Sequence, residues 1–259
     1  MKTICNINLK GGTGKTATAV NLAAELVRRG KRVLAIDADP QHNSTDFWGC
    51  VRDELTLSDV LIGVCSLRYA VQDISMPKLG RLAAVPADMR LVGLDFAQMM
   101  GGTAKWSQAL TKGLEEIAPE LDYTVIDCPP SFTAASVSAL LASNWVVVPV
   151  TADPYSLDGL TALLEQVEQL QARGAGMQLA GTLLTRVSRT RACQQMSALL
   201  GSVRRYRAFR TEIPRTAKVP ESMFARTPLC QYAPGSRAAE AYQAWTDELL
   251  DRIGEGAAG

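Results

Sequence analysis

A short run of lysine, glycine and threonine residues near the start of the sequence is spaced to bind the phosphates of a nucleotide. Residues 10–16 read KGGTGKT and lie between an alternating apolar segment and a segment of helical apolar spacing. Glycines allow the main-chain N–H groups of such a loop to converge on one centre, and the following helix presents its positive end to the same centre. Lys15 then reaches the β- and γ-phosphates, and Thr16 ligates Mg²⁺. The run therefore predicts a nucleotide site that includes a magnesium ion.

The spacing of this loop departs from the standard G-x-x-x-x-G-K-[ST] pattern. Counting back from Gly14, the position of the first glycine holds Leu9, and the loop opens instead with Lys10, Gly11 and Gly12. This is the deviant Walker A loop, in which a second lysine begins the motif. A glycine-rich turn without a ligand is the alternative. Strand, loop, Gly-Lys-Thr and helix nevertheless occur in the order that a nucleotide site requires.

Acidic residues at the ends of two further predicted strands supply the other groups of such a site. Asp37 and Asp39 follow the apolar segment 32–36, and Asp127 ends the apolar segment 123–126. The carboxyl ends of parallel strands are where such sheets bind ligands. Asp127 occupies the Walker B position, where a carboxylate holds Mg²⁺, usually through water. We expect Asp37 near the same Mg²⁺ water shell; the alternatives are that Asp37 only caps the next segment and that Asp127 is structural.

Several segments together resemble the ParA/Soj group of partition ATPases, which lies within the ParA/MinD superfamily of dimerising P-loop ATPases. The deviant loop is followed by KRVLAIDADPQ at residues 31–41, DCPPS at 127–131 and IPR at 213–215. The loop is typical of the whole superfamily, and the later segments favour its ParA side. The resemblance covers nearly the whole chain, because these segments extend from its start to well beyond residue 200.

The resemblance implies a role for individual residues in binding and hydrolysing ATP. Lys10 is expected to cross to the ATP of the other subunit in a sandwich dimer, Lys15 to hold the phosphates, and Asp39 to orient or activate the attacking water. Pro214 and Thr216 are expected to pack against the base. The residues expected to contact the nucleotide are Gly11, Gly12, Thr13, Gly14, Lys15, Thr16, Ala17, Pro214 and Thr216. Those expected at Mg²⁺ are Thr16, Asp37 and Asp127.

Three positions depart from the family pattern. Ala17 replaces a second hydroxyl residue after Thr16, which removes one hydrogen bond to the α-phosphate and weakens nucleotide binding by about 1 kcal/mol. Thr216 replaces the asparagine that is common in the family, which calls one hydrogen bond to the base into question. His42 stands where the family usually has glycine, and no catalytic role is expected for it.

Basic residues cluster between positions 186 and 218, although the whole chain carries a net charge of only +1. This segment contains one acidic residue, Glu212, and interleaves Tyr206 and Phe209 with the basic side chains. The clustering favours a surface that contacts phosphates, and a solvated helix face is the alternative. The residues expected to contact DNA are Arg204, Arg205, Arg207 and Lys218.

The expected DNA binding is independent of sequence. No DNA-recognition module precedes the phosphate-binding loop, so we expect nonspecific and strongly salt-dependent binding of double-stranded DNA. The resemblance implies the same, because short ParA-type ATPases bind nonspecific DNA as ATP-bound homodimers. It also implies a ParB-like centromere-binding partner, weak basal ATPase activity, and plasmid or chromosome segregation as the output.

Alternating predicted strands and helices indicate an α/β fold with a doubly wound, mostly parallel sheet and helices on both faces. We expect a single P-loop ATPase domain over residues 1–253 and a flexible tail at 254–259, which is rich in small residues. A chain of 259 residues, 47% of them hydrophobic, is long enough to bury the core of such a domain. The stretch 45–100 is the least informative, with a short helix predicted at 55–61 and a strand at 82–87.

Composition argues against several other classes of protein. The six cysteines form no C-x-x-C pair, which favours reduced structural thiols, and the single histidine leaves little material for a histidine metal site. No apolar run approaches the ~20 residues of a membrane span. No basic and then apolar leader precedes the first predicted strand. We therefore expect a cytoplasmic protein without a membrane partner, and the DNA binding that the resemblance implies would associate it with the nucleoid.

ATPases of the same superfamily with other partners are the main alternatives. A MinD-like switch would insert a basic amphipathic C-terminal helix into a lipid surface, whereas residues 245–253 are acidic on their polar side. A metal-cluster carrier needs paired cysteines near the C-terminus, and a polysaccharide-linked tyrosine kinase needs a tyrosine-rich tail; the sequence has neither. A positioning ATPase for another cargo stays open.

Overall fold

A mostly parallel sheet forms the centre of the molecule. The computed structural model describes residues 1–94, 106–153 and 155–254, and within these ranges it contains a seven-stranded sheet in the order β3-β4-β2-β5-β1-β6-β7. Neighbouring strands run parallel, except that β3 and β4 form an antiparallel hairpin at one edge. The strands are β1 (Lys2–Asn6), β2 (Val33–Asp37), β3 (Gln72–Met76), β4 (Gly80–Val85), β5 (Tyr123–Asp127), β6 (Trp145–Thr151) and β7 (Gln178–Thr185).

The central strands are apolar at nearly every position because both faces of the sheet are covered. All residues of β2 and β5 are buried, as expected for parallel strands between two helical layers. Successive side chains point to opposite faces. Cys5 and Ile126 belong to one hydrophobic cluster, and Ile4 and Val125 belong to the other. These features confirm the predicted doubly wound α/β fold.

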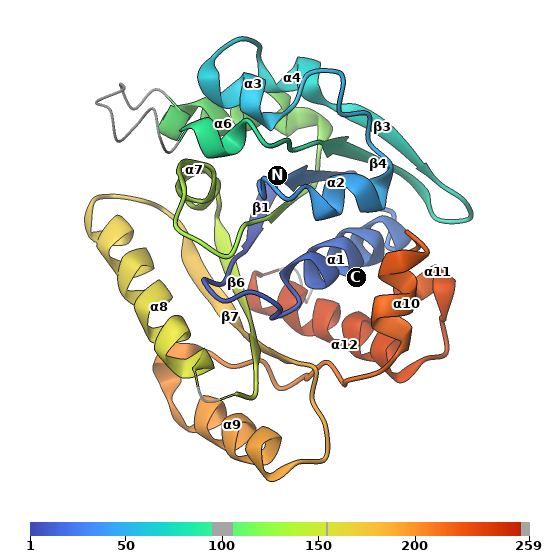
Figure 1. Cartoon of the computed structure of the whole chain (residues 1–259), viewed down its shortest axis with the longest axis vertical. Coiled ribbons are helices and arrows are strands. Elements are labelled where there is room, and N and C mark those ends of the chain that lie inside the picture. Colours follow the sequence, from blue (N-terminus) through green and yellow to red (C-terminus); the bar gives the residue numbers. More distant parts are fainter. Residues whose placement is uncertain (95–105, 154, 255–259) are drawn as a thin grey trace.

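Helices cover the two faces of the sheet in separate layers. Figure 1 shows α7 and α8 to the left of β1, β6 and β7, and α1 and α12 to the right. Buried side chains of α3, α6, α7 and α8 join the first cluster, and those of α1, α2 and α12 join the second. The described helices are α1 (Lys15–Arg28), α2 (Asn43–Trp48), α3 (Leu57–Ile62), α4 (Leu67–Ala70), α6 (Trp106–Ile117), α7 (Ala134–Leu141), α8 (Ser156–Ala172), α9 (Arg191–Ser202), α10 (Lys218–Phe224), α11 (Leu229–Tyr232) and α12 (Arg237–Arg252), with the 3₁₀ turns η1 (Ala118–Glu120) and η2 (Arg204–Tyr206).

The region after α2 holds more regular structure than the sequence indicated. The predicted helix corresponds to α3 and the predicted strand to β4, but β3 was not predicted and pairs with β4 as a half-exposed edge strand. Residues 255–259 of the predicted tail lie outside the described ranges, and the single-domain boundary stays a prediction. Among the helices described here, none combines the length and apolar character needed to cross a membrane.

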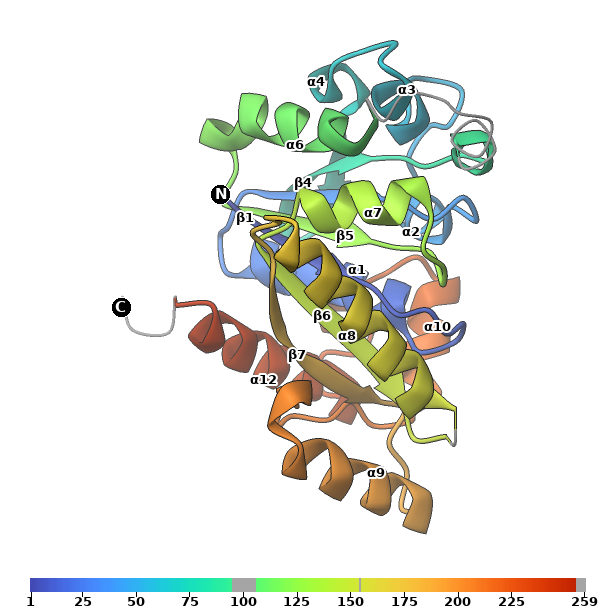
Figure 2. The same ribbon diagram turned by 90° about the vertical axis from the view of Figure 1, so that its left-hand side faces the viewer.

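The carboxyl ends of three central strands meet at one edge of the sheet. β5 lies between β1 and β2, and the register pairs Asp127 with Asn6 on one side and with Asp37 on the other. β1 leads directly into the phosphate-binding loop. Figure 2 shows the turn between β1 and α1 and the helix α10 at the same end of the sheet. The parallel register thus brings the loop and two strand-ending aspartates, which are distant in sequence, to one site.

Candidate nucleotide site

The phosphate-binding loop has the backbone geometry that its glycines allow. Gly12 and Gly14 adopt φ angles of +75° and +85°, a left-handed conformation that is accessible to glycine without strain. Gly14 immediately precedes α1, so the free N–H groups of the first helical turn face the loop. Lys15 is buried, and its Nζ donates to the main-chain carbonyl of Lys10 at 3.0 Å. The lysine therefore lies back across the loop, in position to meet a phosphate.

A cavity of about 1290 Å³ lies over this loop. It joins the loop to Asp39, to the segment around Pro214 and to the apolar side of α10. The predicted nucleotide contacts that line it are Gly11, Gly12, Gly14, Lys15, Thr16, Ala17, Pro214 and Thr216. The side chains of Thr13, Asp37 and Asp127 are buried and do not line the cavity. The cavity thus unites the predicted phosphate and base contacts.

Asp127 is the one buried carboxylate of the described residues whose two oxygens both lack a hydrogen-bond partner. Its side chain is 2% exposed at the end of β5. A buried charge without a partner is costly, and a bound cation would remove that cost. Mg²⁺ prefers carboxylate and hydroxyl oxygens, completed by water and substrate phosphates. Asp127 and Thr16 supply such donors and fit the ion; no group of three or more His, Cys, Asp or Glu residues that could hold a metal occurs in the described ranges.

The charged groups of the site shift one another's pKa values. Burial raises the pKa of Asp127 well above its ordinary value, and the neighbouring Asp37 carboxylate adds to this rise. The Thr16 hydroxyl and the Lys15 ammonium act in the opposite direction. Burial lowers the pKa of Lys15, while Asp127 and Asp39 oppose that change. The site therefore holds three aspartates close together with one lysine, an excess of negative charge that a divalent cation would offset.

Asp37 differs from Asp127 because its oxygens are occupied by protein donors. Its Oδ2 accepts hydrogen bonds from the main-chain N–H and the hydroxyl of Thr45, at 2.7 and 2.8 Å. Its Oδ1 accepts the main-chain N–H of Asp39 at 3.0 Å. Burial raises the pKa of Asp37, and the hydrogen bonds from Thr45 oppose that rise. These contacts fit the alternative in which Asp37 caps α2, and its assignment to the Mg²⁺ shell stays a prediction.

Asp39 lines the cavity and keeps one oxygen available. Its Oδ1 accepts the main-chain N–H of Gln41 at 2.9 Å, which fixes the side chain on the loop before α2. Its Oδ2 accepts no hydrogen bond from any residue in the described ranges. The carboxylate can therefore accept a hydrogen bond from a water molecule in the cavity.

Lys10 does not point into the cavity. Its Nζ forms an ion pair with Asp153, the residue two positions beyond the end of β6. The same carboxylate accepts the hydroxyls of Thr151 and Ser156 at 2.6 and 2.7 Å. Sequence reasoning did not identify Asp153, because an isolated aspartate after a strand gives no signal of its partner. The predicted reach of Lys10 to a second subunit's ATP stays a prediction.

Two residues at the end of β7 contact the phosphate-binding loop directly. The Thr185 hydroxyl donates to the main-chain carbonyl of Thr13 at 2.8 Å, and Arg186 donates to that of Gly12 at 3.2 Å. Neither residue was assigned to this loop from the sequence. Both line the cavity, so β7 supports the loop and also closes one side of the site.

The structure separates the predicted DNA contacts. Arg205 forms two hydrogen bonds to Glu168 of α8, at 3.0 and 2.9 Å, and Lys218 pairs with Glu221 at 2.8 Å. Arg204 and Arg207 have no acidic partner within the described part of the chain. Lys218 begins α10, the helix that lines the cavity, whereas the main chain of Arg207 lies beside Gly181 of β7.

Comparisons with known proteins agree with these features. The family model described as an AAA domain matches residues 1–179. The chain is 36% identical to the chromosome-partitioning ATPase Soj of Thermus thermophilus, covering 98% of each protein. It is 34% identical to the sporulation initiation inhibitor protein Soj of Bacillus subtilis, covering 93% of this chain and 95% of that protein.

Solved structures with nucleotides share the fold. A Cyanothece McdA(D38A)–ATP complex matches with a TM-score of 0.84 and 25% identity, over 97% of this chain and 96% of that one. Cobyrinic acid a,c-diamide synthase of Mycobacterium smegmatis with an ATP analogue and magnesium matches with a TM-score of 0.81 and 27% identity, over 99% and 97%. With both Soj relatives aligned over nearly their full length, this chain belongs to the ParA/Soj family of chromosome-partitioning ATPases.

Proposed function

We propose that this protein hydrolyses ATP with Mg²⁺, dimerises when ATP is bound, and in that state binds nonspecific duplex DNA during plasmid or chromosome partition. The observation that carries the proposal is the buried Asp127 carboxylate, whose oxygens accept no hydrogen bond and whose pKa is lowered by the nearby Lys15 ammonium and Thr16 hydroxyl against the effect of burial. A ParB-like centromere-binding protein is the proposed partner, as the family membership suggests.

The chemistry follows from the positions of the side chains. Lys15 and the loop N–H groups bind the phosphates, and Thr16 and Asp127 would hold Mg²⁺. When bound, the ion neutralises charge that develops on the transferred phosphoryl group. Asp39 Oδ2 accepts a hydrogen bond from the attacking water and orients it toward the γ-phosphate. Catalysis is then a matter of positioning and charge stabilisation.

Nucleotide binding is tested by Lys15→Ala. The variant loses a point charge that no neighbouring residue replaces, because Lys10 is paired with Asp153. We expect light scattering with ATP and Mg²⁺ to show a dimer for the wild type and a monomer for this variant. Lys112→Ala, at an exposed position of α6, is the matched control. A full dimer of Lys15→Ala would contradict the assignment of the loop.

DNA is favoured over a lipid surface by the environment of α12. Its apolar residues Trp245 and Leu249 are fully buried against the rest of the domain. The apolar side of this helix is thus occupied by protein contacts, whereas Arg204 and Arg207 keep their charges free of acidic neighbours within the described ranges. Two copies in a dimer double the phosphate contacts and raise avidity for DNA.

The DNA proposal is tested by filter binding of random-sequence duplex DNA at several salt concentrations. Retention should be strong with ATP and weak with ADP, and should fall when Arg204, Arg205 and Arg207 are replaced with alanine. Each phosphate-binding side chain that is removed lowers the salt slope by about one unit, and Arg205 should contribute least because Glu168 already binds its guanidinium. Arg81→Ala, which removes an exposed arginine of β4, is the control. Equal affinity in all states and variants would refute DNA switching and favour a protein cargo.

A further inference from the structure

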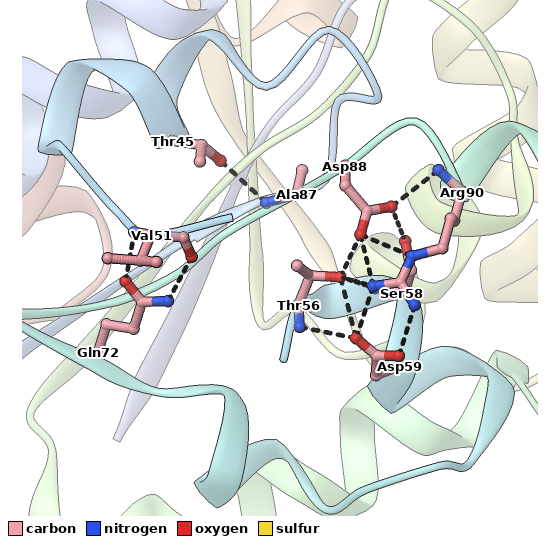
Figure 3. A network of polar contacts seen from close by, with 9 residues as sticks. All are labelled: Thr45, Val51, Thr56, Ser58, Asp59, Gln72, Ala87, Asp88 and Arg90. Atoms are coloured by element: carbon pink, nitrogen blue, oxygen red, sulfur yellow. Dashed lines mark hydrogen bonds and ion pairs between the residues drawn. The ribbon is translucent and has the colours of Figure 1, made fainter. Parts of the chain in front are cut away.

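Thr45 joins the nucleotide site to a second polar network, around the start of α3. It is the third residue of α2, and 1% of it is exposed. Its hydroxyl donates to Asp37 Oδ2 at 2.8 Å and accepts the main-chain N–H of Ala87 at 2.9 Å. The second of these contacts is drawn in Figure 3. One hydroxyl therefore connects the end of β2 with the segment that follows β4.

The Asp37 carboxylate connects Thr45 to the main chain of Asp39 through hydrogen bonds. It accepts two hydrogen bonds from Thr45 and one from the main-chain N–H of Asp39. Residues 37–45 are thereby closed into a ring that contains the Asp39 loop. A displacement of the Thr45 hydroxyl would move the carboxylate, and with it the main chain that carries Asp39.

The other end of the connection is firmly held. Asp88, next to Ala87, accepts the hydroxyls of Thr56 and Ser58, each at 2.7 Å. Arg90 pairs with Asp88 and with Asp59, also at 2.7 Å. Figure 3 shows these side chains converging at the start of α3. Ala87 is thus a fixed reference point, against which Thr45 is placed.

We propose that Thr45 is a positioning residue for ATP hydrolysis. Its hydroxyl holds the Asp37 carboxylate, and through it the Asp39 loop, in the geometry in which Asp39 orients the attacking water. This role rests on the proposed function, which assigns that water to Asp39. Valine keeps the shape of threonine but removes the hydroxyl, which leaves the Ala87 N–H without an acceptor and takes one donor away from Asp37.

The test compares Thr45→Val and Thr45→Ser with Thr56→Val, a matched control. Thr56 is also fully buried and belongs to the same network, but it contacts Asp88 instead of Asp37. The measurements are single-turnover ATP hydrolysis, affinity for a fluorescent ATP analogue, and amide hydrogen exchange over residues 38–48 without nucleotide. Thr45→Val should hydrolyse ATP about 10- to 100-fold more slowly, bind the analogue as the wild type does, and exchange faster over residues 38–48.

Thr45→Ser should restore hydrolysis and protection. Thr56→Val should leave both near the wild-type level, even if it lowers the unfolding temperature, because Ser58 and Arg90 still hold Asp88 and with it the segment at Ala87. Thr45→Ala replaces the valine variant if the latter fails to fold, and the same separation of hydrolysis from binding is expected. Wild-type hydrolysis in Thr45→Val, or an equal loss of hydrolysis in Thr56→Val, would overturn the positioning role of Thr45 but not the proposed function. Absence of hydrolysis in the wild type would instead overturn the proposed function.

Discussion

Asp127→Asn should raise the free energy of unfolding of the ligand-free protein, whereas Asp37→Asn should lower it. Asp37 and Asp127 are each 2% exposed and stand opposite each other on neighbouring strands. Asp127 has no hydrogen-bond partner for either oxygen, whereas Asp37 accepts three hydrogen bonds. Asp127→Asn removes a buried charge that accepts no hydrogen bond and is repelled by Asp37. Asp37→Asn places an amide group against N–H donors.

The expected magnitudes follow from these contacts. Relief of the unpartnered charge should raise the free energy of unfolding of Asp127→Asn by about 1–3 kcal/mol without ligand. Loss of a charge-assisted hydrogen bond in Asp37→Asn should lower it by about 1–3 kcal/mol. For a chain of this size, each kcal/mol moves the unfolding midpoint by about 2–4 °C. The two variants should therefore lie on opposite sides of the wild type.

Thermal unfolding with and without ATP and Mg²⁺ is the assay. Ligand at 100 times its dissociation constant stabilises a protein by about 2.7 kcal/mol. The wild type should gain a shift of this order, while Asp127→Asn should lose most of it because the proposed Mg²⁺ carboxylate is missing. A ligand-free Asp127→Asn less stable than the wild type would refute the reasoning, since it would mean that this carboxylate is satisfied in the folded protein.

Three further outcomes are expected. Asp39→Ala should bind ATP but release phosphate about 100-fold more slowly, and normal turnover would move the role to another carboxylate. Gly181→Ala places a methyl group 2.5 Å from a main-chain carbonyl and should cost at least about 1–3 kcal/mol by chemical denaturation, whereas Gly201→Ala meets nothing within 4 Å and serves as its control. Burial raises the pKa of Glu248, but hydrogen bonds from two main-chain N–H groups and an arginine lower it by more. The pKa of Glu248 therefore lies below its ordinary value. The ionised carboxylate thus stabilises the fold at pH values above the ordinary glutamate pKa of about 4.3. The wild type should unfold at a higher temperature than Glu248→Gln at neutral pH, and this difference should shrink as the pH falls below that value.

Features that depend on neighbours in sequence were predictable. The phosphate-binding loop needs only consecutive residues, since its glycines, Lys15 and the start of α1 determine its shape together. The strands carrying Asp37 and Asp127 were evident because both of their faces are apolar. The parallel register then had to bring their carboxyl ends together, and so the fold class and the family followed from the sequence.

Tertiary structure decided which partners those residues have. Lys10 and Asp153 are 143 positions apart, and nothing local marks them as a pair. The same holds for Arg205 with Glu168 and for the two carboxylates of the site, which look alike in sequence. Asp37 accepts hydrogen bonds from Thr45 and Asp39, whereas Asp127 accepts none. Such hydrogen bonds depend on how helices and strand ends pack against each other. Short-range sequence patterns carry no information about that packing.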